Sequence, residues 1–215
     1  MDTPPPLRVE GDDAPLSQDG RGAGGEGNSL CRHLLALVLQ LHWSTTMLQQ
    51  FIKGRVYVFI DAENVFYSQR TLGWHISYEK LMGYLTRECG DNLKCFIYSG
   101  VDESNTQQRK FLDMLEINGY VVRTKAIKKI RDRDGATKWK GNLDIELAFE
   151  MDDTKMKYDT AILVSGDSDF AVPVDRIKKS GKRIIVMSTR GHISRELLER
   201  AKFIDLRKLK NEISQ

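Results

Sequence analysis

Residues 55–64 read RVYVFIDAEN, an unbroken apolar run that ends at an aspartate. Valine, isoleucine, tyrosine and phenylalanine favour β-structure, and an apolar run without polar alternation is typical of a strand buried on both faces. Such strands occur in parallel sheets that helices cover on both sides. The stretch therefore predicts a buried first strand over residues 55–60, with Asp61 at its carboxyl end.

The rest of the chain alternates strands and helices around this first strand. Further strands are predicted at residues 94–99, 160–165, 183–188 and 203–206, with an extended segment at 120–130. Helices are predicted from the first strand to Tyr67, at 78–89, 104–118, 142–153 and 170–180, and after Ser194. Ser104 and Gln107 have the spacing of a capping box. The alternation predicts an α/β fold whose central sheet is mostly parallel, with helices on both faces.

The amino-terminal quarter differs in composition from the rest. Residues 1–28 hold four of the five prolines, six of the seventeen glycines and a net charge of −4, which predicts an acidic, disordered tail. Residues 29–52 have no acids, and apolar residues recur there at helical spacing. They are expected to form an apolar-faced helix that docks on the domain, a partner protein or a second copy, or an extension that the domain does not need. Residues 53–215 form the expected domain.

The sequence carries no pattern of a membrane or secreted protein. Its longest apolar run is far shorter than the roughly 20 residues of a membrane-spanning helix, and its acidic start does not resemble a secretory signal. Cys31, Cys89 and Cys95 suggest neither a disulfide framework nor a CxxC zinc pair. We therefore expect free thiols in a reducing compartment, the cytoplasm.

Acidic residues follow two of the predicted strands. Asp61 ends the first, and Gly166-Asp167-Ser168-Asp169 follows the strand at 160–165, while Asp144 lies in the first turn of a predicted helix. Ligands of open parallel sheets bind beyond the carboxyl ends of the strands. Carboxylates gathered there repel one another unless a cation lies between them, and Mg²⁺ or Mn²⁺ prefers such oxygens. Taken singly, each aspartate is also suited to capping a helix or complementing its dipole.

A basic stretch precedes Asp144. Residues 123–140 carry a net charge of +6, equal to that of the whole of 53–215. Clustered bases can follow a phosphate backbone, and an aromatic ring can stack on an unpaired base. The alternative is a solvated basic loop. The candidate contacts for single-stranded RNA are Arg123, Lys125, Lys128, Lys129, Arg131, Arg133, Lys138, Trp139 and Lys140.

Three motifs occur together in a fixed order. They are FIDAENV at 59–65, KGNLD at 140–144 and VSGDSDF at 164–170. With these motifs, the chain over about residues 54–207 resembles the NYN domain of the LabA-like group, within the PIN-like nuclease superfamily. The resemblance implies a Rossmann-like PIN-type fold and an acidic metal site that acts on RNA. It assigns Asp61, Asp144, Asp167 and Asp169 as metal-site acids, with Asn64 and Ser165 in supporting positions.

The expected activity is hydrolysis of RNA phosphodiester bonds with Mg²⁺ or Mn²⁺ held by the four aspartates. Asp61 and Asp167 are the expected direct ligands, because each follows a strand end. The alternative is a PIN-like module that binds RNA or a protein without cleaving RNA. A nucleotide-binding Rossmann domain is disfavoured, because no GxGxxG or Walker A pattern follows the first strand.

Overall fold

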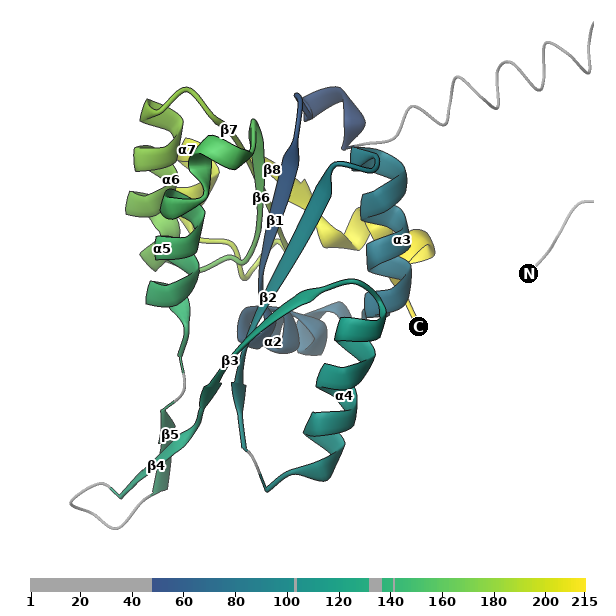
Figure 1. Cartoon of the computed structure of the whole chain (residues 1–215), viewed down its shortest axis with the longest axis vertical. Coiled ribbons are helices and arrows are strands. Elements are labelled where there is room, and N and C mark those ends of the chain that lie inside the picture. Colours follow the sequence, from purple (N-terminus) through teal and green to yellow (C-terminus); the bar gives the residue numbers. More distant parts are fainter. Residues whose placement is uncertain (1–47, 103, 132–136, 141) are drawn as a thin grey trace, which may run out of the picture. The chain divides into compact units, whose positions relative to one another are not determined.

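The computed structural model describes residues 48–102, 104–131, 137–140 and 142–215 (Figure 1). Its strands confirm the predicted α/β fold. Six of them form one central sheet in the order β3-β2-β1-β6-β7-β8, and every neighbouring pair is parallel. These strands are β1 (Val56–Asp61), β2 (Leu93–Val101), β3 (Val121–Ala126), β6 (Thr160–Val164), β7 (Arg183–Ser188) and β8 (Lys202–Asp205).

A separate antiparallel hairpin connects the end of β3 to the next helix. Its strands β4 (Lys128–Arg131) and β5 (Thr137–Lys140) pair so that Lys128 lies opposite Lys140. Figure 1 shows the hairpin extending beyond β3, away from the central sheet. The segment expected to be extended over 120–130 therefore belongs to two different sheets, with Ile127 between them.

Helices cover both faces of the central sheet, as the unbroken apolar run of β1 predicts. Val58 and Ile60 face one core, while Tyr57 and Phe59 face the other. On the first face pack α2 (Ala62–Leu72), α3 (Tyr78–Cys89), α4 (Thr106–Ile117) and α8 (Lys210–Ile213). On the second pack α5 (Asp144–Asp153), α6 (Ala171–Lys179) and α7 (Arg195–Arg200).

Side-chain caps begin several helices. Ser194 caps α7 as predicted, since its hydroxyl accepts from the backbone N–H of Leu197. The predicted capping box at Ser104 is wrong: Asn105 caps α4 and accepts from two backbone N–H groups. The hydroxyl of Ser104 instead donates to Asp102 at 2.6 Å. The physical reason is that the serine hydroxyl is engaged by Asp102. Asn105 is then the residue whose side chain reaches the free N–H groups at the start of α4.

The direction in which the chain crosses the sheet reverses beside β1. From β1 the chain proceeds outward through β2 and β3, and it then returns to place β6 on the other side of β1. In parallel α/β sheets, ligands bind where the strand order reverses in this way, beyond the carboxyl ends of the two strands. A ligand site is therefore expected beyond the carboxyl ends of β1 and β6.

The packed body extends at least to Leu48, which is fully buried in the first core. A short 3-10 helix follows at Gln49–Phe51. The predicted tail at 1–28 and most of the predicted helix at 29–52 lie outside the described residues.

Two of the three cysteines lie among the residues that the structure describes. Cys89 and Cys95 are free, and burial raises the pKa of both, that of Cys89 to about 12. Cys31 lies outside the described residues. In the part of the chain that the structure describes, no helix has both the length and the apolar character needed to cross a bilayer.

Candidate metal centre

Four aspartates lie near the carboxyl ends of β1 and β6. Asp61 is the last residue of β1. In the turn between β6 and α6, Asp167 caps a short 3-10 helix, Ser168–Phe170, which contains Asp169. Asp144 is the first residue of α5, which packs on the same face as α6. The sheet order therefore brings acids from three distant parts of the sequence to the place where the strand order reverses.

Asp61 is buried and both of its carboxylate oxygens accept hydrogen bonds. Oδ1 accepts from the backbone N–H of Asn64 at 3.0 Å, which caps α2, and Oδ2 accepts from the hydroxyl of Ser165 at 3.1 Å. Burial is the largest cause that raises the pKa of Asp61 to about 6; the nearby charge of Asp144 acts in the same direction, and the two hydrogen bonds act against it. Asp61 therefore caps α2, and its ionised form is disfavoured by burial and by the neighbouring acids.

Hydrogen bonds of Asn64 and Ser165 connect the segment after β6 to the carboxyl end of β1 and the start of α2. The side-chain carbonyl of Asn64 accepts from the backbone N–H of Gly166 at 3.0 Å. Ser165 donates to Asp61 and accepts from the backbone N–H of Asp167 at 3.2 Å. The two residues predicted as supporting thus connect the two halves of the site through hydrogen bonds.

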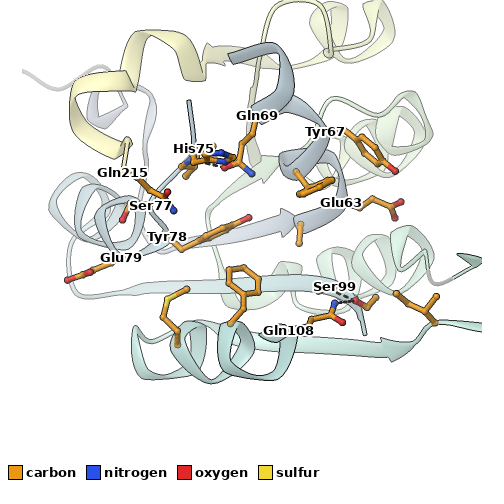
Figure 2. Close-up of a pocket in the computed structure, with 17 residues that line it drawn as sticks. Glu63, Tyr67, Gln69, His75, Ser77, Tyr78, Glu79, Ser99, Gln108 and Gln215 are labelled. Atoms are coloured by element: carbon orange, nitrogen blue, oxygen red, sulfur yellow. Dashed lines mark hydrogen bonds between the residues drawn. The ribbon is translucent and has the colours of Figure 1, made fainter. Parts of the chain in front are cut away.

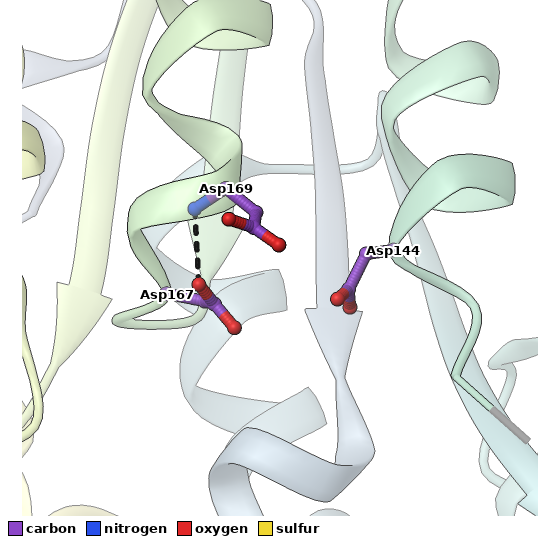
Figure 3. Close-up of side chains that lie close together, drawn as sticks. All are labelled: Asp144, Asp167 and Asp169. Atoms are coloured by element: carbon purple, nitrogen blue, oxygen red, sulfur yellow. Dashed lines mark hydrogen bonds between the residues drawn. The ribbon is translucent and has the colours of Figure 1, made fainter. Parts of the chain in front are cut away.

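Three of the four carboxylates form one group. Single oxygens of Asp144, Asp167 and Asp169 all lie within 4.8 Å of one another. Figure 3 shows the carboxylate of Asp144 facing those of Asp167 and Asp169 across the space between α5 and the turn after β6. The backbone N–H of Asp169 donates to Asp167 at 2.9 Å, which fixes the turn that carries both.

The group of three is electrostatically unfavourable by itself. Burial raises the pKa of Asp144, and the charges of Asp167, Asp169 and Glu146 raise it further. A hydrogen bond from the side-chain amide of Asn142 acts in the opposite direction. A cation between the three carboxylates would remove the repulsion that disfavours their ionised forms.

Asp61 lies beside this group without being one of its three members. Asp61 and Asp144 line the same small cavity, together with Glu63 and Tyr98. Of the four aspartates predicted to form one site, three lie in one cluster and Asp61 lies next to them. Direct metal ligation by Asp61 stays a prediction.

Two side chains of the predicted RNA contacts are described, and both form ion pairs with α5. Arg123 makes two hydrogen bonds to Glu150, at 2.9 and 2.7 Å, and Lys125 approaches Glu146 to 2.6 Å. The side chains of the other seven, Lys128, Lys129, Arg131, Arg133, Lys138, Trp139 and Lys140, lie outside those that the structure describes.

Two contributors to the site were not assigned a role from the sequence. Asn142 binds Asp144 twice, because its carbonyl also accepts the backbone N–H of Asp144 at 2.8 Å. An asparagine two residues before a helix-starting aspartate is the signal for this local arrangement. Glu150, which also accepts from the hydroxyl of Tyr98 at 2.9 Å, has no such local signal, because its partners lie on β2 and β3.

Comparisons with known proteins agree with this architecture. The sequence model of the NYN domain family matches residues 55–207. The chain is 33% identical over 169 residues to the Low amplitude and bright protein LabA of Synechococcus elongatus, a match that covers 77% of this chain and 90% of that protein. The fold is similar to that of a Vibrio parahaemolyticus protein of unknown function, with a TM-score of 0.63 and 24% identity over 76% of this chain and 97% of that one. Residues 55–207 include all four aspartates.

Proposed function

This chain belongs to the NYN domain family, in its LabA-like group, and from this we propose that it is a metal-dependent ribonuclease that hydrolyses phosphodiester bonds of single-stranded RNA. The observation that carries the proposal is the group of three carboxylates whose oxygens lie within 4.8 Å of one another. The group lies where ligands of parallel α/β sheets bind. The resemblance of the motifs to the PIN-like nuclease superfamily supplies the reaction class.

The three carboxylates fit a small divalent cation. Mg²⁺ binds oxygen at about 2.0–2.1 Å, so ligands on opposite sides of the ion lie about 4.2 Å apart. Asp144, Asp167 and Asp169 each offer one oxygen within 4.8 Å of the others, close to this separation, and an all-carboxylate donor set suits Mg²⁺ or Mn²⁺. A cation held there supplies positive charge for the scissile phosphate and lowers the pKa of a bound water.

The protein residues around the three aspartates hold them in place in this proposal. The hydroxyl of Ser165 donates a hydrogen bond to Asp61 and accepts one from the backbone N–H of Asp167. The side-chain carbonyl of Asn64 accepts one from the backbone N–H of Gly166. Asn142 holds the carboxylate of Asp144 at the start of α5. Supporting hydrogen bonds of this kind orient metal ligands and affect metal affinity.

RNA would reach the site along the basic segment at 123–140. The hairpin β4–β5 leaves from the carboxyl end of β3 and returns to α5, which begins with Asp144. The basic residues of β5 are therefore close in sequence to Asp144 of the metal centre. Arg123 and Lys125 are paired with acids of α5, so we assign phosphate contact chiefly to the hairpin.

The test is cleavage of a mixed single-stranded RNA by the full chain in Mn²⁺, Mg²⁺ or EDTA. We expect cleavage that needs the metal and is lost in Asp167→Asn. The matched control is Asp113→Asn, which removes an exposed acid of α4 and should cleave like the wild type. Equal residual cleavage in the wild type and Asp167→Asn would contradict the proposal and favour the module that binds without cleaving.

A further inference from the structure

A second cavity adjoins the metal centre. It has a volume of about 700 Å³ and lies between α2, the start of α3, the carboxyl end of β2 and α4 (Figure 2). This volume is within the range of small-molecule sites, roughly 300–1,000 Å³. We call it the α2–α4 groove. None of the four aspartates lines it.

Aromatic rings from three helices line the α2–α4 groove. Phe66 and Tyr67 of α2 meet edge to face, with ring centres 5.6 Å apart, and they are 55% and 47% exposed. Tyr78 of α3 and Phe111 of α4 also meet edge to face, at 5.4 Å. The guanidinium of Arg70 lies 5.3 Å from the centres of both α2 rings. Exposed rings held in this way offer flat surfaces on which a planar ligand can stack.

The charge of the groove indicates which part of a nucleotide it would hold. Among the described residues that line it, none is lysine or arginine, while Glu63 and Glu79 are acids. The two acids disfavour a phosphate in the groove, and the guanidinium of Arg70 lies over the two exposed α2 rings, so an uncharged base suits the groove better than a phosphate. The side-chain carbonyl of Gln69 already accepts from the backbone N–H of Ile76 at 2.8 Å, so its amide nitrogen is the group it can offer to a ligand.

The groove adjoins the small cavity beside the metal centre. Glu63 and Gly100 line both the α2–α4 groove and the small cavity that holds Asp61 and Asp144. Tyr78 lies near enough to Asp61 that this charge, in addition to burial, raises the pKa of its phenol. A chain whose phosphate lies at the aspartates can therefore place its neighbouring nucleotide in the groove.

We propose that the α2–α4 groove binds an unpaired nucleobase of the RNA next to the phosphate that is cleaved, with Phe66 and Tyr67 as the stacking surface. This inference rests on the proposed ribonuclease function and adds the place where one unpaired base of the RNA is held. Stacking tolerates every base, so the groove selects for single strands and not for a sequence.

The test uses a short single-stranded RNA that carries one 2-aminopurine, a base whose fluorescence falls when it stacks. The RNA is titrated with full-length Asp167→Asn, which leaves it uncut, in Mg²⁺. We expect quenching on binding, and Phe66→Ala or Tyr67→Ala added to this protein should weaken affinity about 5- to 140-fold and abolish the quenching. Ile117→Ala is the control, because this apolar side chain of α4 is 85% exposed and lines neither the groove nor the cavities beside the aspartates.

The outcomes separate this inference from the proposed function. RNA cleavage by the wild type without 2-aminopurine quenching would overturn the nucleobase site and leave the nuclease standing. Quenching that Phe66→Ala removes, in a wild type that cleaves nothing, would support the site and contradict the nuclease. Binding of a free nucleoside monophosphate in the groove with no binding of RNA would also overturn the inference, since the ligand would then be a free nucleotide.

Discussion

The buried carboxylate of Asp61 makes the stability of the metal-free protein depend on pH. Its pKa in the folded protein is about 6, against an ordinary value of 3.8. The folded state therefore favours the protonated form, and this stabilisation is complete below about pH 4 and is lost as the pH rises through 6. By the size of the shift, the loss is about 3 kcal/mol.

We expect Asp61→Asn in EDTA to remove this part of the pH dependence. Other carboxylates whose pKa values are lowered, such as Asp205, act in the opposite sense, so the wild type and the variant must be compared at each pH. Urea unfolding from pH 4 to pH 7 measures the difference. Parallel curves for the two proteins would show that Asp61 does not have the raised pKa.

The hydroxyl of Ser165 connects Asp61 to the turn that carries Asp167. We expect Ser165→Ala to cost about 1–3 kcal/mol in unfolding free energy, because buried groups lose their partners, and to weaken Mn²⁺ binding about 10-fold or more. Calorimetric titration with Mn²⁺ and urea unfolding measure the two effects.

Ser188 of β7 provides the matched control for Ser165. It is as buried as Ser165, but its hydroxyl has no hydrogen-bond partner among the described residues. Ser188→Ala should therefore leave Mn²⁺ affinity unchanged and be neutral or stabilising. Equal effects of the two substitutions would mean that the hydrogen bonds of Ser165 do not position the site.

At the scale of an element, the turn between β6 and α6 depends on close backbone packing. A Cβ added at Gly166 would lie 2.2 Å from the backbone oxygen of His192, which cannot give way as a flexible side chain would. We expect Gly166→Ala to displace the turn, lower the melting temperature and weaken metal binding by Asp167 and Asp169 together.

Gly83 of α3 tests whether this effect comes from the contact or from the loss of glycine. A Cβ there would meet nothing within 4 Å, and alanine favours a helix by about 0.5–1 kcal/mol. Gly83→Ala should raise the melting temperature. A Gly166→Ala protein as stable as Gly83→Ala, with unchanged Mn²⁺ affinity, would contradict the role of the close contact.

At the scale of the whole molecule, a divalent cation should stabilise the fold, because it binds the folded state and relieves repulsion between the aspartates. At a concentration 100 times its dissociation constant, Mn²⁺ is expected to add about 2.7 kcal/mol. Thermal unfolding of the wild type, Asp144→Asn and Asp113→Asn with Mn²⁺ or EDTA measures this. Only Asp144→Asn should lose the shift, and a wild type unaffected by Mn²⁺ would count against the metal centre.

Local patterns in the sequence determined the elements and the order of the acids. The apolar run at 55–60 indicated a strand buried on both faces, and β1 has helices packed on both. Asp61 ends β1 and Asp167 follows β6, as their positions at the ends of apolar runs predicted. These features depend on a few neighbouring residues, so the sequence alone was sufficient. The Ser104 cap failed because Asp102, two residues before it, competes for the same hydroxyl.

Only the tertiary structure decided which side chains meet. The return of the chain to place β6 beside β1 brings Asp144 to Asp167 and Asp169, whereas both oxygens of Asp61 are occupied by Asn64 and Ser165. The same packing pairs Arg123 and Lys125 with Glu150 and Glu146, and it forms the α2–α4 groove from three helices. Sequence spacing sets the face on which a side chain lies within its own element. Contacts between elements depend on the order of strands and the packing of helices, which no local pattern records.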